Sequence, residues 1–278
     1  MSIAQDTLAL LRDAAAAQPL PRVRALHLPP APPPGGMRGE FCALELEDGS
    51  LGLSYVLLGD TWAQLTANAG RHVQPGDDPL ALARSYASAD TLQRTLGFAA
   101  VNAITRSVMG RAGWQPPPST DSIGQLDPQP GETIGMIGHF TPLLPRLVAR
   151  GARVIVLELR ADLVGERDGV RVTLDPAELR GCDKILATGT LLLNHTLEPM
   201  LAACRHAQRF VLVGPSVGGP PDPLFARGVT LLGGSWVDDP AAFLQALKAG
   251  MPPGASVRKF ALTAADWPGW RTLLDAGR

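Results

Sequence analysis

The chain lacks an excess of charge of either sign. It carries 25 Lys and Arg residues and 26 Asp and Glu residues among 278, which leaves a formal net charge of −1. It also lacks a run of basic residues and any interleaving of basic with aromatic residues. Without such features no positive field attracts nucleic acid or an anionic membrane surface. We therefore expect neither as a partner.

Cysteines and long apolar runs are scarce as well. The three cysteines, Cys42, Cys182 and Cys204, are widely spaced and form no C-x-x-C pair. Free thiols within apolar runs are most often small buried hydrophobic groups. The chain opens on an amphipathic helix pattern rather than a secretory signal, and no apolar stretch reaches the roughly 18 residues that a membrane span needs. These observations predict a cytoplasmic protein with reduced thiols.

Two proline-rich stretches divide the sequence. The first covers residues 28–36, and the second, longer and more polar, covers residues 113–132. Such composition favours extended chain and does not sustain a helix. We predict an α+β domain over residues 1–115, a linker over residues 116–131 and a second domain over residues 132–278.

The pattern before the linker is mixed. A helix is expected over residues 3–17, followed by alternating strands in which EDGS (residues 47–50) forms a hairpin turn. Two helices then follow, and Asp90 is a good N-cap for the second. This order of strands and helices predicts a small α+β layer.

The pattern after the linker alternates between apolar strands and helices. TIGMIG, RVIVLEL, DKILATG, RFVLVGPS and VTLLGGSWV each read as a strand that is apolar on both faces. Strands of this kind, each followed by a helix, are typical of a parallel sheet that is covered on both sides. The expected fold class is therefore α/β, with a doubly wound, Rossmann-like second domain.

Ligands of such sheets bind beyond the carboxyl ends of the strands. The turn after the first of these strands, GMIGHF, does not have the G-x-G-x-x-G spacing of a dinucleotide site. Glu158 ends the next strand 20 residues after Gly138, where an acidic residue could bind ribose hydroxyls. The alternative remains open that the glycines only permit a tight turn and that Glu158 is solvated.

The third strand ends in ATGTLLLNHTL (residues 187–197), which is rich in small polar side chains. Thr190 or Asn194 could cap the helix that we expect from about residue 193 to residue 206. One cap needs only one side chain, so the surplus hydroxyls favour a bound carboxylate or phosphate. Ser216, in the GPS turn after the fourth strand, could add another hydroxyl.

Histidine could add metal or acid–base chemistry at the same strand ends. His139 and His195 both follow predicted strands, and together with Glu158 they could form a metal site in space. No short spacing such as H-E-x-x-H supports that arrangement. The metal ligands that we predict are His139, Glu158 and His195.

Four segments carry a resemblance to a known family. IGMIGHFTPLLPRL, ILATGTLLLNHTLEPML, VLVGPSVGGPPDPLFARGVTLLGGSWVDD and LQRTLGFAAVNAI resemble the prokaryotic family named for "putative heavy-metal chelation". The resemblance implies an enolase-N-terminal-like domain joined to a Rossmann-like domain, with a ligand site in the cleft between them. The ligand-binding positions that it implies are Gly138, His139, Phe140, Glu158, Thr188, Gly189, Thr190, Asn194, Thr196, Gly214, Pro215 and Ser216, to which we add Asn102.

Two functions remain open. The first is the binding or processing of a small polar metabolite or a metal chelate in that cleft, linked to metal homeostasis. The second is an enzyme that uses a nucleoside cofactor such as S-adenosylmethionine, with Glu158 on the ribose. The cofactor expected is accordingly a metal ion or S-adenosylmethionine. Trp267 and Trp270 near the C-terminus could pack on the first domain or on a second subunit of a homodimer.

Overall fold

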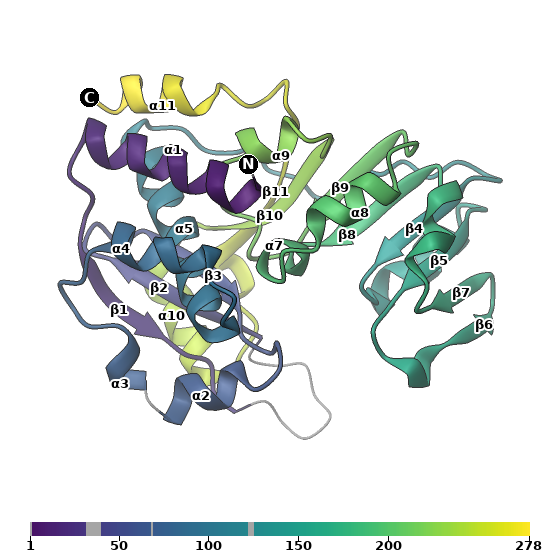
Figure 1. Ribbon diagram of the computed structural model, residues 1–278, viewed down its shortest axis with the longest axis horizontal. Coiled ribbons are helices and arrows are strands. Elements are labelled where there is room, and N and C mark those ends of the chain that lie inside the picture. The colour runs from purple at the N-terminus through teal and green to yellow at the C-terminus, as the bar shows by residue number, and fades with distance from the viewer. Residues whose placement is uncertain (1, 32–39, 68, 122–124) are drawn as a thin grey trace.

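The first half of the chain folds into a small sheet covered by helices (Figure 1). The computed structural model describes residues 2–31, 40–67, 69–121 and 125–278. Three antiparallel strands lie in the order β1-β2-β3. The elements are α1 (Ile3–Ala17), β1 (Val23–His27), β2 (Phe41–Leu46), β3 (Leu51–Tyr55), α2 (Thr61–Ala67), α3 (Ala69–His72), α4 (Pro79–Ala83), η1 (Arg84–Ala87) and α5 (Thr91–Arg111).

The helix starts follow from local chemistry. Ser2 and Gln5 form a capping box at the start of α1, whose bounds match the predicted residues 3–17. The Asp90 side chain accepts the backbone N–H of Gln93, which confirms the predicted N-cap of α5. Helix α5 then lies across β3 and β2 and buries most of its length against them.

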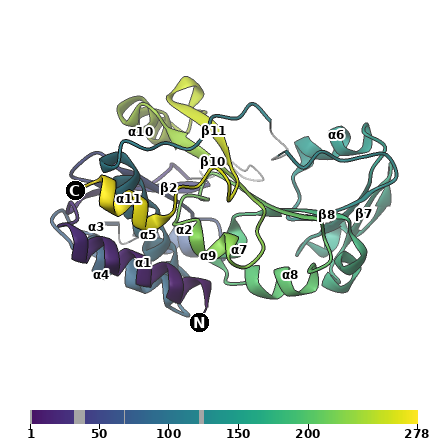
Figure 2. The ribbon, with the colours of Figure 1, turned by 90° about the horizontal axis from the view of Figure 1, so that it is seen from above.

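The second half contains a larger sheet of eight strands, in the order β11-β10-β9-β8-β4-β5-β7-β6. Neighbours from β10 to β7 pair in parallel, while β11 and β6 pair antiparallel at the two edges. Figure 2 shows α6 and α8 on opposite faces of this sheet. Its elements are β4 (Thr133–Ile137), η2 (Thr141–Leu143), α6 (Leu144–Val148), β5 (Arg153–Leu157), η3 (Ala161–Leu163), β6 (Gly165–Arg167), β7 (Val170–Thr173), η4 (Pro176–Gly181), β8 (Lys184–Thr188), α7 (Thr190–Leu193), α8 (Leu197–Ala203), β9 (Arg209–Val213), α9 (Asp222–Phe225), β10 (Leu231–Val237), α10 (Pro240–Ala249), η5 (Gly254–Ser256), β11 (Val257–Leu262) and α11 (Trp270–Ala276).

The predicted α/β fold class is confirmed, with additions that the sequence pattern did not indicate. These include the hairpin of β6 and β7, the antiparallel strand β11, the short helices α2 and α3, and the helix α11. Strand β6 is exposed along its whole length, so it lacks the apolar pattern by which buried strands are recognised. In the described residues, no helix is both long and apolar enough to cross a membrane.

The two halves share packing surfaces. Helix α10 packs on the face of the small sheet opposite α5, where Phe243 joins the buried side chains of Leu51 and Leu53. At the C-terminus, α11 lies beside α1 and α5 (Figures 1 and 2). Between the halves, the proline-rich stretch runs along the edge of β11, where Pro118 bridges Phe260. Residues 122–124 of the predicted linker lie outside the described residues.

Candidate functional site

The winding of the large sheet reverses between β4 and β8. From β4 the chain moves outward through β5 to β7, and it then returns to the other side of β4 to form β8 and continue to β9. In open α/β sheets, ligands bind beyond the carboxyl ends of the strands at such a reversal. The predicted site residues at the ends of β4, β5, β8 and β9 therefore lie at the expected edge. We call this group the strand-end cluster; it consists of Gly138, His139, Phe140, Glu158, Thr188, Gly189, Thr190, Gly214, Pro215 and Ser216.

The turn after β4 touches the turn after β8. Gly138 has a φ of 91°, and a Cβ at this position would lie 3.1 Å from the Thr188 Cγ2 atom and 3.9 Å from the Phe140 ring. The Thr188 Oγ1 atom accepts hydrogen bonds from the Thr190 hydroxyl at 3.1 Å and from the Thr190 backbone N–H at 3.3 Å. The structure thus brings together Gly138, Phe140, Thr188 and Thr190.

Backbone hydrogen bonds fix the Glu158 carboxylate beside this turn. Its Oε2 atom accepts the N–H of His139 at 3.0 Å, and its Oε1 atom accepts the N–H of Leu159 at 2.9 Å. The His139 imidazole makes a contact of 2.9 Å between its Nδ1 atom and the Thr141 hydroxyl. Both carboxylate oxygens already accept N–H groups, so Glu158 is a positioned anion rather than a freely solvated one.

The first half adds two groups that the sequence analysis missed. Tyr55, at the end of β3, has a raised pKa because of burial and the charges of Glu40 and Glu158. Burial also raises the pKa of Glu40. The charge of Glu158 thus acts on the end of β3. No motif marks Tyr55, because its interaction with Glu158 depends on how the two halves pack.

The turn after β9 is tied to the first half by Asn102. The Asn102 Nδ2 group donates to the Leu53 carbonyl at 2.7 Å and to the Ser216 carbonyl at 2.9 Å. Gly189 permits a close approach to this turn, since a Cβ there would lie 2.6 Å from the Val217 Cγ2 atom. Asn102 thus holds the Gly214–Ser216 turn in place through backbone contacts. Ser216 is buried, whereas Pro215 is exposed.

The predicted helix over residues 193–206 is interrupted. His195 adopts a φ of 58°, and the chain forms the four-residue α7 and the seven-residue α8 on either side of it. The Asn194 side chain accepts hydrogen bonds from the N–H and the hydroxyl of Thr196. The polar groups of Asn194 and Thr196 therefore form hydrogen bonds within the turn itself. Helix α7 has only four residues, so its dipole contributes little to anion binding.

The structure does not bring His195 together with His139 and Glu158. The His195 ring packs edge-on against Tyr86 of the first half, with 5.2 Å between ring centroids. Within the described parts of the chain, no three His, Cys, Asp or Glu side chains gather closely enough to hold a metal ion. The left-handed turn directs His195 away from the strand-end cluster, so the predicted three-residue metal set is not assembled.

The environment of His195 predicts a pH dependence. Burial and the charge of Arg94 lower its pKa below the ordinary 6.5, so the folded chain favours the neutral imidazole. Its contribution to stability should be present above pH 6.5 and be lost as the pH falls towards the lowered folded pKa. Asparagine tolerates the left-handed backbone, so His195→Asn is the suitable variant. We expect its urea midpoint of unfolding to fall less between pH 7.5 and pH 5.5 than that of the wild type. An equal loss in both proteins would contradict this assignment.

The cysteines are unsuited to binding soft metals. Burial raises the pKa of Cys42 and Cys182 to about 12 each and that of Cys204 to about 11. Metals bind thiolates, which these pKa values disfavour at neutral pH. All three thiols are free and buried, as the sequence analysis expected.

Comparisons with known proteins agree with this architecture. Residues 121–265 match the DUF364 family and residues 39–105 match the DUF4213 family, both described as "Putative heavy-metal chelation". No curated protein matches the sequence. A DUF364 protein of unknown function from Pyrococcus horikoshii has a similar fold, with a TM-score of 0.66, 20% identity, and coverage of 93% of this chain and 99% of that one. A DUF364 protein of unknown function from Desulfitobacterium hafniense has a TM-score of 0.66 and 19% identity, with coverage of 93% of this chain and 98% of that one. The chain therefore belongs to the DUF364 family.

Proposed function

We propose that the protein binds a small polar metabolite that carries a metal ion as a chelate, at the strand-end cluster between the two halves. The observation that carries the proposal is the positioned Glu158 carboxylate, which lies near Tyr55 and close to the His139 backbone. Oxygen groups of negative character are complementary to a cationic ligand. The family description, which concerns metal chelation, supports the same class of ligand.

The donor set favours a chelate over a resident metal centre. A protein-held ion needs three or four protein ligands, and the described residues supply no group of three. The residues present therefore do not fit a permanent metal site. A metal that arrives with its own chelator needs only one or two further ligands, which Glu158 and His139 could supply. In this proposal the metal is cargo, serving the cell's metal homeostasis.

The turn after β4 offers little support to a nucleoside cofactor. Its sequence, GMIGHF, lacks the G-x-G-x-x-G spacing that lets the backbone approach a pyrophosphate. Each Glu158 oxygen accepts one backbone N–H and keeps a second lone pair, so the contacts of Glu158 are compatible with either ligand. Because the turn lacks that spacing, we expect S-adenosylmethionine, NAD and ATP to leave the melting temperature unchanged.

Calorimetric titration with nickel(II)–histidine tests the proposal, because this complex is not anionic and would not be repelled by the cluster. We expect it to bind more tightly than nickel(II) alone or histidine alone. Glu158→Gln removes the charge at nearly constant shape and should weaken binding at least about tenfold. The matched control is Glu166→Gln, at an exposed carboxylate on β6, which should change nothing. Equal binding by the Glu158→Gln variant would refute the proposal.

A further inference from the structure

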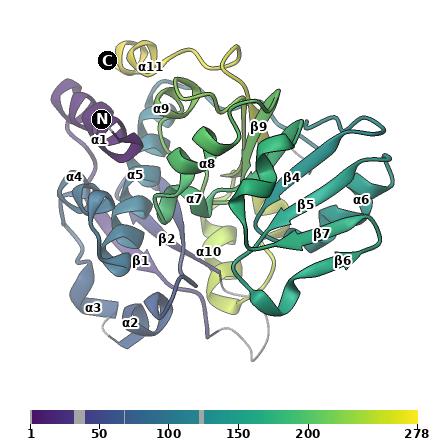
Figure 3. The same cartoon turned by 45° about the vertical axis from the view of Figure 1, so that its right-hand side comes forward.

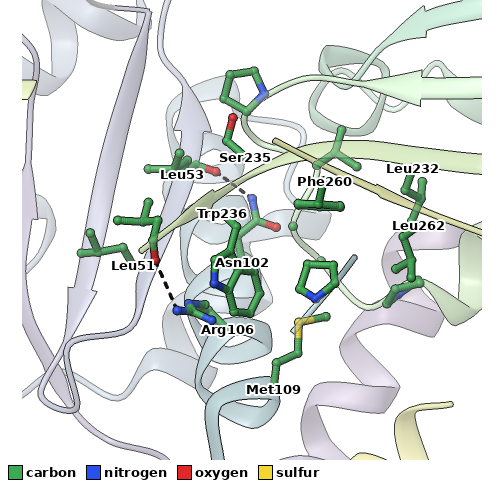
Figure 4. A pocket seen from close by; sticks show the side chains of 17 residues that line it. Leu51, Leu53, Asn102, Arg106, Met109, Leu232, Ser235, Trp236, Phe260 and Leu262 are labelled. Atoms are coloured by element: carbon green, nitrogen blue, oxygen red, sulfur yellow. Dashed lines mark hydrogen bonds between the residues drawn. The ribbon is translucent and has the colours of Figure 1, made fainter. Parts of the chain in front are cut away.

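A cavity lies behind the turn after β9 (Figure 4). It has about 610 Å³ of free space when the solvent at its open mouth is counted, and about 50 Å³ of that space admits the centre of a water molecule. Its walls come from β3, α5, β10, β11 and residues 215–221, and they are mostly apolar: Leu51, Leu53, Met109, Leu232, Phe260 and Leu262.

One wall carries an unsatisfied acceptor. Asn102 is 4% exposed, and its Oδ1 atom has no hydrogen-bond partner among the described residues. Figure 4 shows the amide nitrogen facing Leu53 and the oxygen turned to the opposite side. Gly218 and Gly219 lie beside this buried oxygen, and a Cβ at Gly219 would stand 3.5 Å from it. Leaving a buried acceptor unpaired is costly, so a ligand with a donor group would gain by pairing with it.

A cation lies one helical turn further along α5. The Arg106 guanidinium stacks on the Trp236 ring, 3.3 Å from its centroid, and its Nη2 group donates to the Val237 carbonyl at 3.3 Å. Arg106 forms no ion pair within 4.0 Å among the described residues, and the carboxylates of Asp238 and Asp48 act on it from farther away. Burial, the largest cause, lowers the pKa of Arg106 to about 10, so the group remains charged at neutral pH. A half-buried cation without a paired anion suits a carboxylate ligand.

The two polar groups can serve one molecule. Residues four apart on a helix have Cβ atoms roughly 5–6 Å from each other on the same face. We propose that this cavity is a second small-molecule site, which takes a 2-hydroxy or 2-amino carboxylic acid with an apolar or aromatic body. Arg106 binds the carboxylate, the Asn102 Oδ1 atom accepts a hydrogen bond from the hydroxyl or amine, and the apolar walls enclose the body.

Isothermal titration with 3-phenyllactate tests this proposal on the full chain. Two analogues remove one group each: 3-phenylpropionate lacks the hydroxyl, and 3-phenyl-1,2-propanediol lacks the carboxylate. We expect 3-phenyllactate to bind, 3-phenylpropionate to bind several-fold more weakly, and the diol to bind at least about tenfold more weakly. Equal affinity for the acid and the diol, or no binding of any of the three at millimolar concentration, would overturn the proposal.

Variants locate the binding. Arg106→Gln should weaken the binding of 3-phenyllactate at least about tenfold. Arg12→Gln, at an exposed arginine of α1, should leave the affinity unchanged. Ser235→Met fills the cavity from β10 and should abolish binding while the protein remains folded by circular dichroism. Glu158→Gln should leave 3-phenyllactate binding unchanged, which separates this site from the strand-end cluster. If Ser235→Met retained full affinity, the cavity would not be the site.

Discussion

Replacing Gly52 by alanine is expected to lower the free energy of unfolding by about 3 kcal/mol or more. Gly52 lies on β3 where α5 crosses the small sheet, and an added Cβ would stand under 3.0 Å from the Ala99 carbonyl oxygen and the Ala103 nitrogen. Both are backbone atoms in the middle of a long helix, so neither can rotate aside. Chemical denaturation should show a lower midpoint, and thermal melting a loss of roughly 6–12 °C.

The matched control is Gly110→Ala, on α5 itself. Gly110 is exposed, and nothing lies within 4 Å of a Cβ built there. Since alanine is a better helix former, this variant should be unchanged or more stable by up to about 1 kcal/mol. If Gly52→Ala melted like the wild type, the close approach of α5 to β3 would be wrong.

Replacing Trp270 by alanine is expected to cost about 3–5 kcal/mol. The side chain is 3% exposed, and its Nε1 group donates to the Leu10 carbonyl of α1 at 2.9 Å. Its backbone N–H also donates to the Asp222 carboxylate at 3.2 Å, which anchors the start of α11. The large cavity left behind would release α11 from α1. Denaturation followed by circular dichroism measures the loss.

Trp270→Phe separates the two parts of this contact. It keeps most of the buried ring but loses the indole donor, so we expect a smaller cost of about 1–2 kcal/mol. A Trp270→Ala protein of undiminished stability that had changed its oligomeric state instead would indicate that the tryptophan packs on a second subunit. The contact with Leu10 shows that Trp270 packs on the first half, which is one of the two arrangements that the sequence left open.

Local patterns predicted the elements that depend on local chemistry. The range of α1, the Asp90 cap of α5 and the apolar parallel strands all follow from periodicity and capping within a few residues. The helix expected from residue 193 begins only at Leu197, because His195 adopts a left-handed backbone, which the sequence does not signal for a histidine. Strand β11 was missed because its pairing with β10 is decided by tertiary contacts.

The strand-end cluster was predictable in part from the order of the strands. Parallel strands place their carboxyl ends at one edge, so the meeting of Gly138 with Thr188 follows from the order of the elements. The contribution of Tyr55, and the tether that Asn102 forms between Leu53 and Ser216, depend on how the halves pack. Sequence alone marked Asn102 as an amide that could face the cleft; its nitrogen holds two backbone carbonyls, and its oxygen has no partner among the described residues.

The position of α10 has a consequence for synthesis on the ribosome. One face of the small sheet is formed by residues near the beginning of the chain, but its cover, α10, spans Pro240–Ala249. A nascent chain that has emerged only as far as the linker therefore exposes Leu51 and Leu53 to solvent. This apolar face therefore stays uncovered until translation has passed residue 249. Slow elongation over the second half would lengthen this exposure and increase the demand for chaperones.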